Sequence, residues 1–457
     1  MISGLVPPCA SARVGADRRF PFTFTSRALR LLLAGFVFVP AAWIDRRLLL
    51  VLVAWNVAVL AAWVFDVRAL PPPGALTVIR NWPSVLTLSV SRQIHLQVTN
   101  DGDAMIAAWV TDLPHPLLRA TPCELAMEIP AHAAGDAFYD VTPAVRGDLQ
   151  MGNAAVRYRG SLGLAECWGT APIAQLVRVY PDIAVSTRGS LALVRARQFA
   201  IERRRVRTFG IGRDFEGLRE FQEGDELRDV CWTATARRGR LITRTYQPER
   251  SQTVWIVVDT GRLMRARDGT QTRLDSAVAA GFALARVVTA AGDRVGLLAY
   301  GRGAQQRVAP GSGALQLRTI LDALAIARAA AVEADHAGAA SAIRTIQKRR
   351  ALIVWLTDVA ETNAVPEVVE SAARLVPEHV LLFVVARPRE LADLASCEPT
   401  DVRDLFRVVA AQEMMERRTR LLSDLRERGA VAVEVPSPEL AGSVIDRYLG
   451  VKERNLL

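Results

Sequence analysis

Two long apolar runs near the start of the chain dominate its pattern of hydrophobic and polar positions. Residues Leu31–Ile44 and Leu48–Phe65 carry no charge, and only the Asp-Arg-Arg triplet at 45–47 separates them. The second run has 18 residues, the usual minimum for a membrane-spanning helix, and residues 28–30 can extend the first. We therefore predict a transmembrane helix hairpin over residues 28–66. A signal peptide is the alternative for the first run, but no small-x-small cleavage site follows it.

The arginines around these runs predict an orientation. Five lie before or at the start of the first run and two lie between the runs: Arg13, Arg18, Arg19, Arg27 and Arg30 against Arg46 and Arg47. The positive-inside rule then makes residues 1–27 a cytoplasmic tail, and a hairpin returns the rest of the chain to the cytoplasm. We expect a multi-pass protein of the bacterial inner membrane whose partner is the lipid bilayer.

Strand signals dominate residues 75–185, after a Pro-Pro-Pro-Gly linker at 71–74. Apolar and polar residues alternate over 86–100, and the turn sequence Asn-Asp-Gly-Asp follows at 100–103. Further short strands are predicted at 107–110, 123–129, 137–141, 154–158 and 176–180. Short strands at this spacing indicate a small β-sandwich.

From residue 253 to about 450, buried strands alternate with helices. Strands are predicted at 254–259, 295–300, 351–356, 380–385 and 431–435, with helices at 315–330, 402–428 and 438–449 and a helical stripe running from Leu274 to Ala285. Such alternation predicts an α/β domain with a mainly parallel, doubly wound sheet.

Composition adds to this outline. Hydrophobic residues make up 51% of the chain, as expected with a membrane segment, and the net charge of +10 is carried almost entirely by arginine. The five cysteines are scattered without a C-x-x-C pair, which argues against a disulfide framework or zinc site and fits the reducing cytosol. Residues 187–252 form a basic connector with interleaved acids. It is open to three interpretations: an ion-paired surface, a lipid-binding segment or a partner-docking face. Without a recognised reader module, nucleic acid is not an expected partner.

One run in the connector is more specific than its charge. It contains Gly224, Asp225, Arg228, Trp232, Ala236, Arg237, Arg238 and Gly239. These residues resemble the signature of the bacterial domain-of-unknown-function-58 family, in which such a run leads into a von Willebrand factor A-like domain. The resemblance implies that fold for residues 253–450. We expect Trp232 to be buried between the connector and this domain.

The resemblance also implies where a metal would bind. Von Willebrand A domains hold a metal-ion-dependent adhesion site at the carboxyl ends of their strands, built from Asp-x-Ser-x-Ser, a distant threonine and a second aspartate. Asp259 and Asp358 match the two aspartates, but Gly261 and Leu263 replace the serines. Alanine at 334 stands at the expected threonine position.

Mg²⁺ requires near-octahedral oxygen ligands, and three hydroxyls are missing here. We therefore predict a degenerate site and no cofactor, although Mg²⁺ bound by Asp259 and Asp358 is the alternative. Without a metal, the two aspartates would cap helices or pair with Arg262.

No catalytic motif is present: the chain lacks G-x-x-x-x-G-K-[ST], G-x-S-x-G and H-E-x-x-H. We expect a membrane-anchored, non-enzymatic protein-interaction module. The resemblance implies a MoxR-type AAA+ ATPase as partner, in the assembly or activation of other proteins. The alternative is a metal-dependent hydrolase that uses Asp259 and Asp358.

Overall fold

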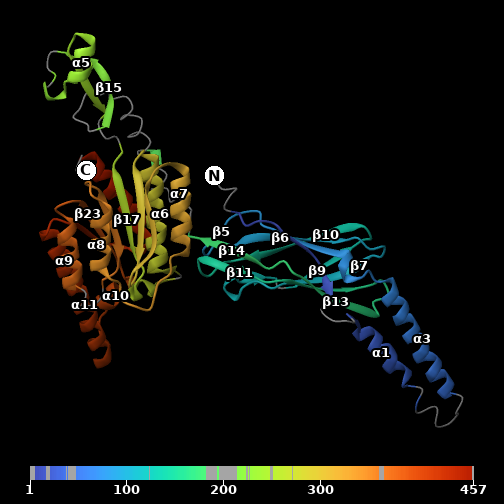
Figure 1. The fold of residues 1–457 in the computed structure, drawn as a ribbon. Coiled ribbons are helices and arrows are strands. Elements are labelled where there is room, and N and C mark those ends of the chain that lie inside the picture. The colour runs from blue at the N-terminus through green and yellow to red at the C-terminus, as the bar shows by residue number, and fades with distance from the viewer. Residues whose placement is uncertain are drawn as a thin grey trace. The chain divides into compact units, whose positions relative to one another are not determined.

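The computed structural model describes residues 6–16, 21–37, 39, 48–122, 124–181, 193–194, 214–222, 225, 227–247, 251–269, 271–359 and 365–454. The chain divides into two compact units, Met1–Asp182 and Ile183–Leu457, with mixed α and β structure (Figure 1). Each unit is described by itself. Residues 203–207 of the basic connector, which include four arginines, and Gly224 of the signature lie outside the described residues.

The first unit contains two apolar helices, α1 (Ser26–Gly35) and α3 (Leu48–Ala69). An 18-residue stretch of the segment Leu49–Ala75 has a mean hydropathy of 2.1 and is 11% buried, so it is long and apolar enough to cross a membrane. Among the described residues it is the one helix that meets this test. Residues 40–47, where the predicted first span ends, lie outside the described part of the chain.

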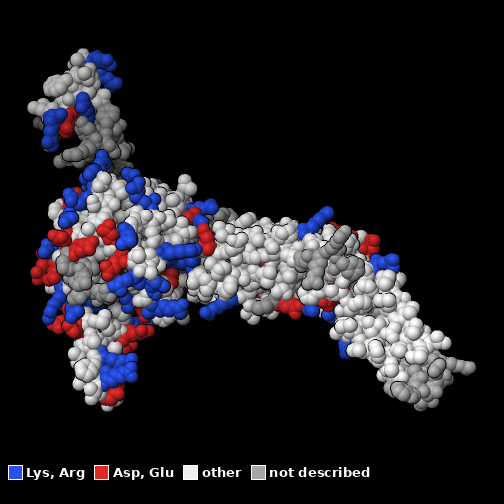
Figure 2. All heavy atoms as spheres, turned by 60° about the horizontal axis from the view of Figure 1, so that its bottom comes forward, with Lys and Arg blue, Asp and Glu red and all other residues white. Residues whose placement is uncertain are grey.

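The two helices pack against each other. The indole Nε1 of Trp55 donates a hydrogen bond to the carbonyl oxygen of Leu31 at 2.8 Å. Gly35 permits this close approach, because a Cβ there would lie 2.7 Å from a Trp55 ring carbon. Asn56, the polar residue in the middle of the apolar run, instead donates to Leu52 within its own helix. Figure 2 shows the arm formed by α1 and α3 as an almost uncharged surface.

The rest of the first unit consists of sandwich-like β-sheets. Their strand orders are β1-β4-β6-β10-β8, β11-β14-β5 and β2-β13-β12-β7-β9, with β3 paired to β13. The strands after the helices are β4 (Leu76–Asn81), β5 (Leu86–Thr87), β6 (Arg92–Asn100), β7 (Ile106–Asp112), β8 (Ala120–Thr121), β9 (Glu124–Ile129), β10 (Ala133–Val141), β11 (Gly147–Met151), β12 (Ala154–Arg159), β13 (Ala165–Ala171) and β14 (Gln175–Tyr180). Alternate residues of β4, β6, β7 and β12 are buried, which encloses one apolar core.

Three strands of this unit precede the helices and were not predicted. They are β1 (Ala10–Arg13), β2 (Gly15–Ala16) and β3 (Phe22–Phe24). Strand β1 pairs with β4, whereas β2 and β3 pair with β13. The interpretation of residues 1–27 as a tail is therefore wrong for these strands. They are too short to show a clear alternation, and long-range pairing with the sandwich determines their structure.

The second unit is built on a six-stranded sheet of order β21-β20-β17-β22-β23-β24. Its strands are β17 (Thr253–Asp259), β20 (Arg294–Tyr300), β21 (Ala304–Gly311), β22 (Leu352–Thr357), β23 (Val380–Arg387) and β24 (Val431–Pro436). All neighbours pair in parallel except β20 and β21, which are antiparallel. The five predicted strands are thus confirmed as β17, β20, β22, β23 and β24, and β21 is an unpredicted edge strand.

Helices cover both faces of this sheet (Figure 1). One group is α6 (Arg273–Ala290), α7 (Gly313–Ile326) and α12 (Leu440–Glu453); the other is α8 (His336–Ile346), α9 (Val365–Leu375) and α11 (Val402–Glu427), with α10 (Arg389–Ala395) packed on α11. The central strands β17 and β22 are almost completely buried, as parallel strands between two helical layers should be.

The signature residues lie in a small separate element before this sheet. Strand β15 (Asp214–Glu220) pairs with β16 (Ile242–Gln247), and the short helix α5 (Trp232–Arg238) connects toward β16. Gly239 ends α5 in the left-handed conformation, with φ of 67°, which glycine adopts without a steric penalty. Asp225 accepts hydrogen bonds from the Gln222 amide and from Arg219. Gly239 and Asp225 of the signature therefore have local structural roles.

Candidate functional site

The two predicted aspartates meet at the carboxyl edge of the parallel sheet. Asp259 is the last residue of β17, and Asp358 directly follows the neighbouring strand β22. Both are buried, at 2% and 1% exposure. This edge is where open α/β sheets bind ligands.

Asp259 is held by its own turn and by the next strand. Its Oδ1 accepts a hydrogen bond from the Gly261 amide at 2.6 Å, and its Oδ2 accepts one from the Thr357 hydroxyl at 2.6 Å. Burial raises the pKa of the Asp259 carboxyl, while His336 and these two hydrogen bonds oppose that change. Thr357, which the sequence analysis did not single out, is thus part of the site.

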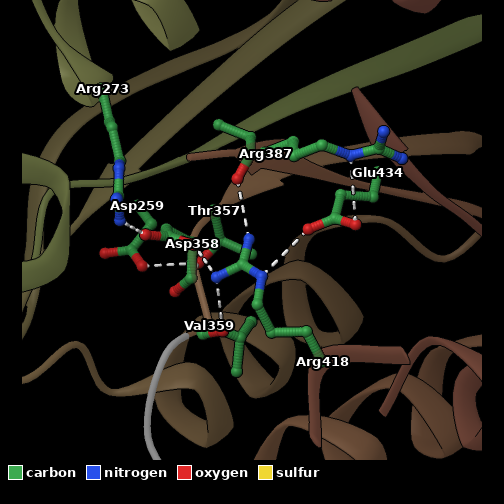
Figure 3. A network of polar contacts seen from close by, with 9 residues as sticks. Asp259, Arg273, Thr357, Asp358, Val359, Arg387, Arg418 and Glu434 are labelled. Atoms are coloured by element: carbon green, nitrogen blue, oxygen red, sulfur yellow. Dashed lines mark hydrogen bonds and ion pairs between the residues drawn. The ribbon is translucent and has the colours of Figure 1, made fainter. Parts of the chain in front are cut away.

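Asp358 lies between two arginines from different helices (Figure 3). Its Oδ2 pairs with Arg273, in the first turn of α6, and its Oδ1 accepts from Nη1 of Arg418 on α11 at 2.8 Å. Burial lowers the pKa of both guanidinium groups, the neighbouring Arg418 adding to the effect on Arg273. Guanidinium groups remain charged in proteins, so Asp358 is neutralised from both sides.

Arg418 is the centre of this network, although it is only 4% exposed. It donates to the carbonyl oxygens of Val359 and Ala386, and its Nε donates to Glu434 on β24 at 2.9 Å. Glu434 also pairs with Arg387 (Figure 3). Through these four hydrogen bonds, the buried Arg418 guanidinium joins the ends of three strands to α11 and stabilises the sheet edge.

This arrangement corrects the predicted role of Arg262. Arg262 pairs with Glu333 at 3.2 Å and is partly exposed, whereas Arg273 and Arg418 neutralise Asp358. Arg262 lies in the turn after β17. Gly261 is extended there, and the Arg262 amide donates a hydrogen bond to the Val332 carbonyl oxygen in the loop before α8. The two partners of Asp358, Arg273 and Arg418, are 85 and 60 positions away from it in the sequence.

The residues present do not fit the ligand set of Mg²⁺. Each of the four carboxylate oxygens of Asp259 and Asp358 already accepts from a protein donor. Gly261 and Leu263 supply no side-chain oxygen, and Ala334 lies against Gly261: a Cβ at 261 would be 3.0 Å from the Ala334 Cβ. Among the described residues, no group of three His, Cys, Asp or Glu side chains is arranged to hold a metal.

A second polar cluster packs behind the aspartates. The Tyr300 hydroxyl lies 2.8 Å from Nδ1 of His336 and accepts a hydrogen bond from Trp355 Nε1 at 2.7 Å. Burial lowers the pKa of the His336 imidazole, although Asp259 and Asp335 oppose this. Burial therefore favours the neutral form of the ring.

The signature residues lie apart from this network and are mostly on the surface. Trp232 is 65% exposed, so the prediction that it is buried is wrong. It is the first residue of the short helix α5. Arg228, Ala236, Arg237 and Arg238 are exposed as well.

The fold and the site define a mixed α/β chain with sandwich-like sheets and an ion-paired acidic site. Comparison of its sequence with known families places residues 217–405 in the family described as "Protein of unknown function DUF58". The resemblance seen in the signature is therefore confirmed by this match over residues 217–405.

Related sequences and structures say little more. Uncharacterized proteins of Mycobacterium bovis and Mycobacterium tuberculosis are 30% identical over 176 residues, which is 38% of this chain. The match spans 55% of each relative's length. A hypothetical protein BatB from Bacteroides thetaiotaomicron aligns over 45% of this chain and all of its own, at 13% identity and a TM-score of 0.28. A PapD-like domain of human CEP192 aligns over 21% of this chain and 72% of its own, at 11% identity and a TM-score of 0.15.

Proposed function

We propose that this protein is a membrane-anchored, non-enzymatic interaction module that binds its partner without a metal ion. The observation that carries the proposal is the double arginine clamp on Asp358. A metal-dependent hydrolase needs open positions on a cation for water and substrate. Here guanidinium groups occupy the positions around the carboxylate, and they can neither be displaced easily nor activate water.

The finer fold assignment is part of this proposal. A mainly parallel sheet with helices on both faces, Asp259 ending one central strand and Asp358 following the next, suits a von Willebrand A-like domain. In this interpretation the arginines stand where such a domain would hold its metal, and the domain keeps the shape of the site without the ion.

The two-helix membrane hairpin is likewise a proposal. Strands β1 to β3 precede α1 and strand β4 follows α3, yet all four pair within the same sandwich-like unit. The chain thus leaves and re-enters the unit at one end. An even number of membrane crossings satisfies this geometry, and the hydrogen bond from Trp55 to Leu31 joins the two helices within the apolar arm.

An apolar stripe on α11 supports binding to another protein. Val402, Leu405, Phe406 and Val409 recur at i, i+3, i+4 and i+7, the spacing of one helix face, and are 47–72% exposed. The stripe precedes Arg418 on the same helix. We infer that a MoxR-type AAA+ ATPase, the partner implied by the family resemblance, covers this stripe.

Affinity purification of the tagged full chain from the membranes of its own cells tests the proposal. A MoxR-type ATPase should co-elute, and Phe406→Glu should reduce its recovery at least tenfold, because a charge would be buried in the interface. Leu315→Glu is the matched control, since Leu315 is 78% exposed on α7, outside the stripe. Absence of an ATPase, or equal loss in both variants, would overturn the assignment.

A further inference from the structure

Both ends of the helical arm are fixed to one turn of the sandwich-like unit. Thr25, the N-cap of α1, donates from its hydroxyl to the Gly163 carbonyl oxygen at 2.8 Å. Asp66, near the end of α3, accepts from the amides of Leu164 and Ala165 at 2.8 and 2.7 Å. The turn at 160–165 therefore holds the start of one helix and the end of the other.

The close packing leaves little freedom at this junction. A Cβ at Gly160 would lie 2.8 Å from Asp66 Oδ1, so the turn can approach the carboxylate only with glycine there. The Tyr158 hydroxyl donates to the Pro71 carbonyl oxygen at 2.7 Å just beyond the helix. Buried hydrogen bonds thus connect the sandwich-like sheets both to the start of α1 and to the end of α3.

Exposed charges on the helix ends at this junction are basic. Arg27, Arg30 and Arg68 are exposed, whereas Asp66 is 1% exposed and engaged with the turn. Arg30 donates from Nε to the Ser26 carbonyl oxygen at 3.2 Å, so its side chain points back toward the sandwich-like unit. This is the direction in which an arginine in an apolar helix reaches the water interface.

Two aromatic residues, one just before α1 and one in α3, stack on each other near these helix ends. Phe24 and Trp63 stack with ring centroids 4.3 Å apart, and tryptophan is enriched at membrane interfaces. The exposed acids of this end, Asp101 and Asp103, lie on a turn that contacts Pro71, beyond the end of α3. Asp103 is paired with His132. The exposed charged residues of the two helix ends are therefore basic, and an aromatic stack joins the start of α1 to α3.

We propose that this basic collar, formed by Arg27, Arg30 and Arg68 around the Phe24–Trp63 stack, binds the head groups of anionic phospholipids. The inference rests on the proposed membrane hairpin, because it takes the apolar arm to lie in the bilayer. Three exposed arginines at the ends of α1 and α3 attract phosphate groups, and the aromatic stack suits the boundary between head groups and acyl chains. The hydrogen bonds of the turn at 160–165 then hold the sandwich-like sheets close to the membrane surface.

The test uses the purified full chain in neutral detergent with fluorescent phosphatidylglycerol as the probe and fluorescent phosphatidylcholine as the uncharged comparison. The wild type should prefer phosphatidylglycerol, and Arg27→Gln with Arg68→Gln should weaken its binding about 30-fold, at roughly fivefold per arginine. High salt should reduce the wild-type preference.

The matched control removes two arginines from the opposite end of the same unit. Arg92 pairs with Val141 at the far end of β6, and the Arg119 carbonyl oxygen accepts from Thr142. Arg92→Gln with Arg119→Gln should leave phosphatidylglycerol binding within about twofold of the wild type, as expected for distant surface changes. Equal binding of both lipids by the wild type, or equal loss in both double variants, would overturn the proposal.

A flotation experiment separates this inference from the hairpin itself. The wild type is reconstituted with phosphatidylcholine vesicles and floated in high salt. If it floats and the collar variant still binds phosphatidylglycerol normally, the collar is wrong and the anchor stands. If the wild type does not float, the membrane hairpin is wrong, and the collar fails with it.

Discussion

At the residue scale, the Asp358 carboxylate compensates the positive charges of two buried arginines. Asp358→Ala would leave Arg273 and Arg418 without their shared carboxylate, so we expect a loss of about 3–5 kcal/mol in unfolding free energy. Glu416→Ala is the control, because its pair with Arg420 on α11 is exposed and contributes about 0.5 kcal/mol or less. Thermal unfolding of the full chain measures both. Similar melting temperatures for the two variants would show that the Asp358 network contributes little.

Two buried histidines give a second prediction at this scale. Burial lowers the pKa of His336 and of His379 below the ordinary value of about 6.5. Below that pH the unfolded chain takes up protons that the folded chain does not, so stability is complete above about pH 6.5 and falls on acidification. Replacing both with Asn should flatten the fall in melting temperature between neutral and mildly acidic pH. His132→Asn, at an exposed position, should not; an unchanged slope in the double variant contradicts the prediction.

The sequence predicted one half of the site. The positions of Asp259 and Asp358 after buried strands indicated that they would meet at the sheet edge, and Gly261 and Leu263 indicated a lack of hydroxyl ligands. It did not predict Arg273 or Arg418. Their contacts with Asp358 depend on how α6 and α11 pack on the sheet, and nothing distinguishes Arg418 from the exposed arginines that neighbour it in α11.

At the element scale, hydrophobic periodicity predicted the core strands well and the edge elements poorly. Strands β17 and β22 are continuous apolar runs whose pattern alone is diagnostic. Strand β21 reads AQQRVAPG and contains no buried residue, because as an edge strand it has one neighbour and is incompletely covered. Strands β1 to β3 depend entirely on partners in the sandwich.

Helix α5 and strand β22 provide a matched test with two tryptophans. Trp232→Ala should change the unfolding free energy by no more than about 0.5 kcal/mol, because the side chain is 65% exposed. Trp355→Ala should cost about 3–5 kcal/mol, because that side chain is 1% exposed and hydrogen-bonded to Tyr300. Calorimetric unfolding distinguishes them, and a large loss in Trp232→Ala would mean that α5 packs against another part of the chain.

The turn at Gly261 offers a test of the degenerate site. Gly261→Ser with Leu263→Ser restores two hydroxyls, but the new Cβ at 261 would lie 3.0 Å from Ala334 and from Asp259 Oδ1, and the arginines would still hold Asp358. We therefore expect no heat of Mg²⁺ binding by calorimetry. Stoichiometric Mg²⁺ binding in this variant would show that the arginine clamp gives way to a metal.

At the scale of the whole molecule, the proposed hairpin sets the topology. Reporters fused before Met1 and after Leu457 should both be cytoplasmic, because the strands on either side of the helical arm belong to one unit and the N-terminal segment is rich in arginine. Reporter activity assayed in intact cells measures this. A periplasmic signal at either end, with the other cytoplasmic, would indicate an odd number of crossings.

The most direct test of the account is partner binding by the unmodified chain with and without EDTA. The ATPase is captured on the immobilised full chain in detergent, first with Mg²⁺ and no nucleotide and then after chelation. If two arginines replace the metal at Asp358, the amount of bound ATPase should be the same in both conditions. Loss of binding in EDTA, restored by Mg²⁺ and absent from Asp259→Asn and Asp358→Asn variants, would show that the aspartates form a working metal site.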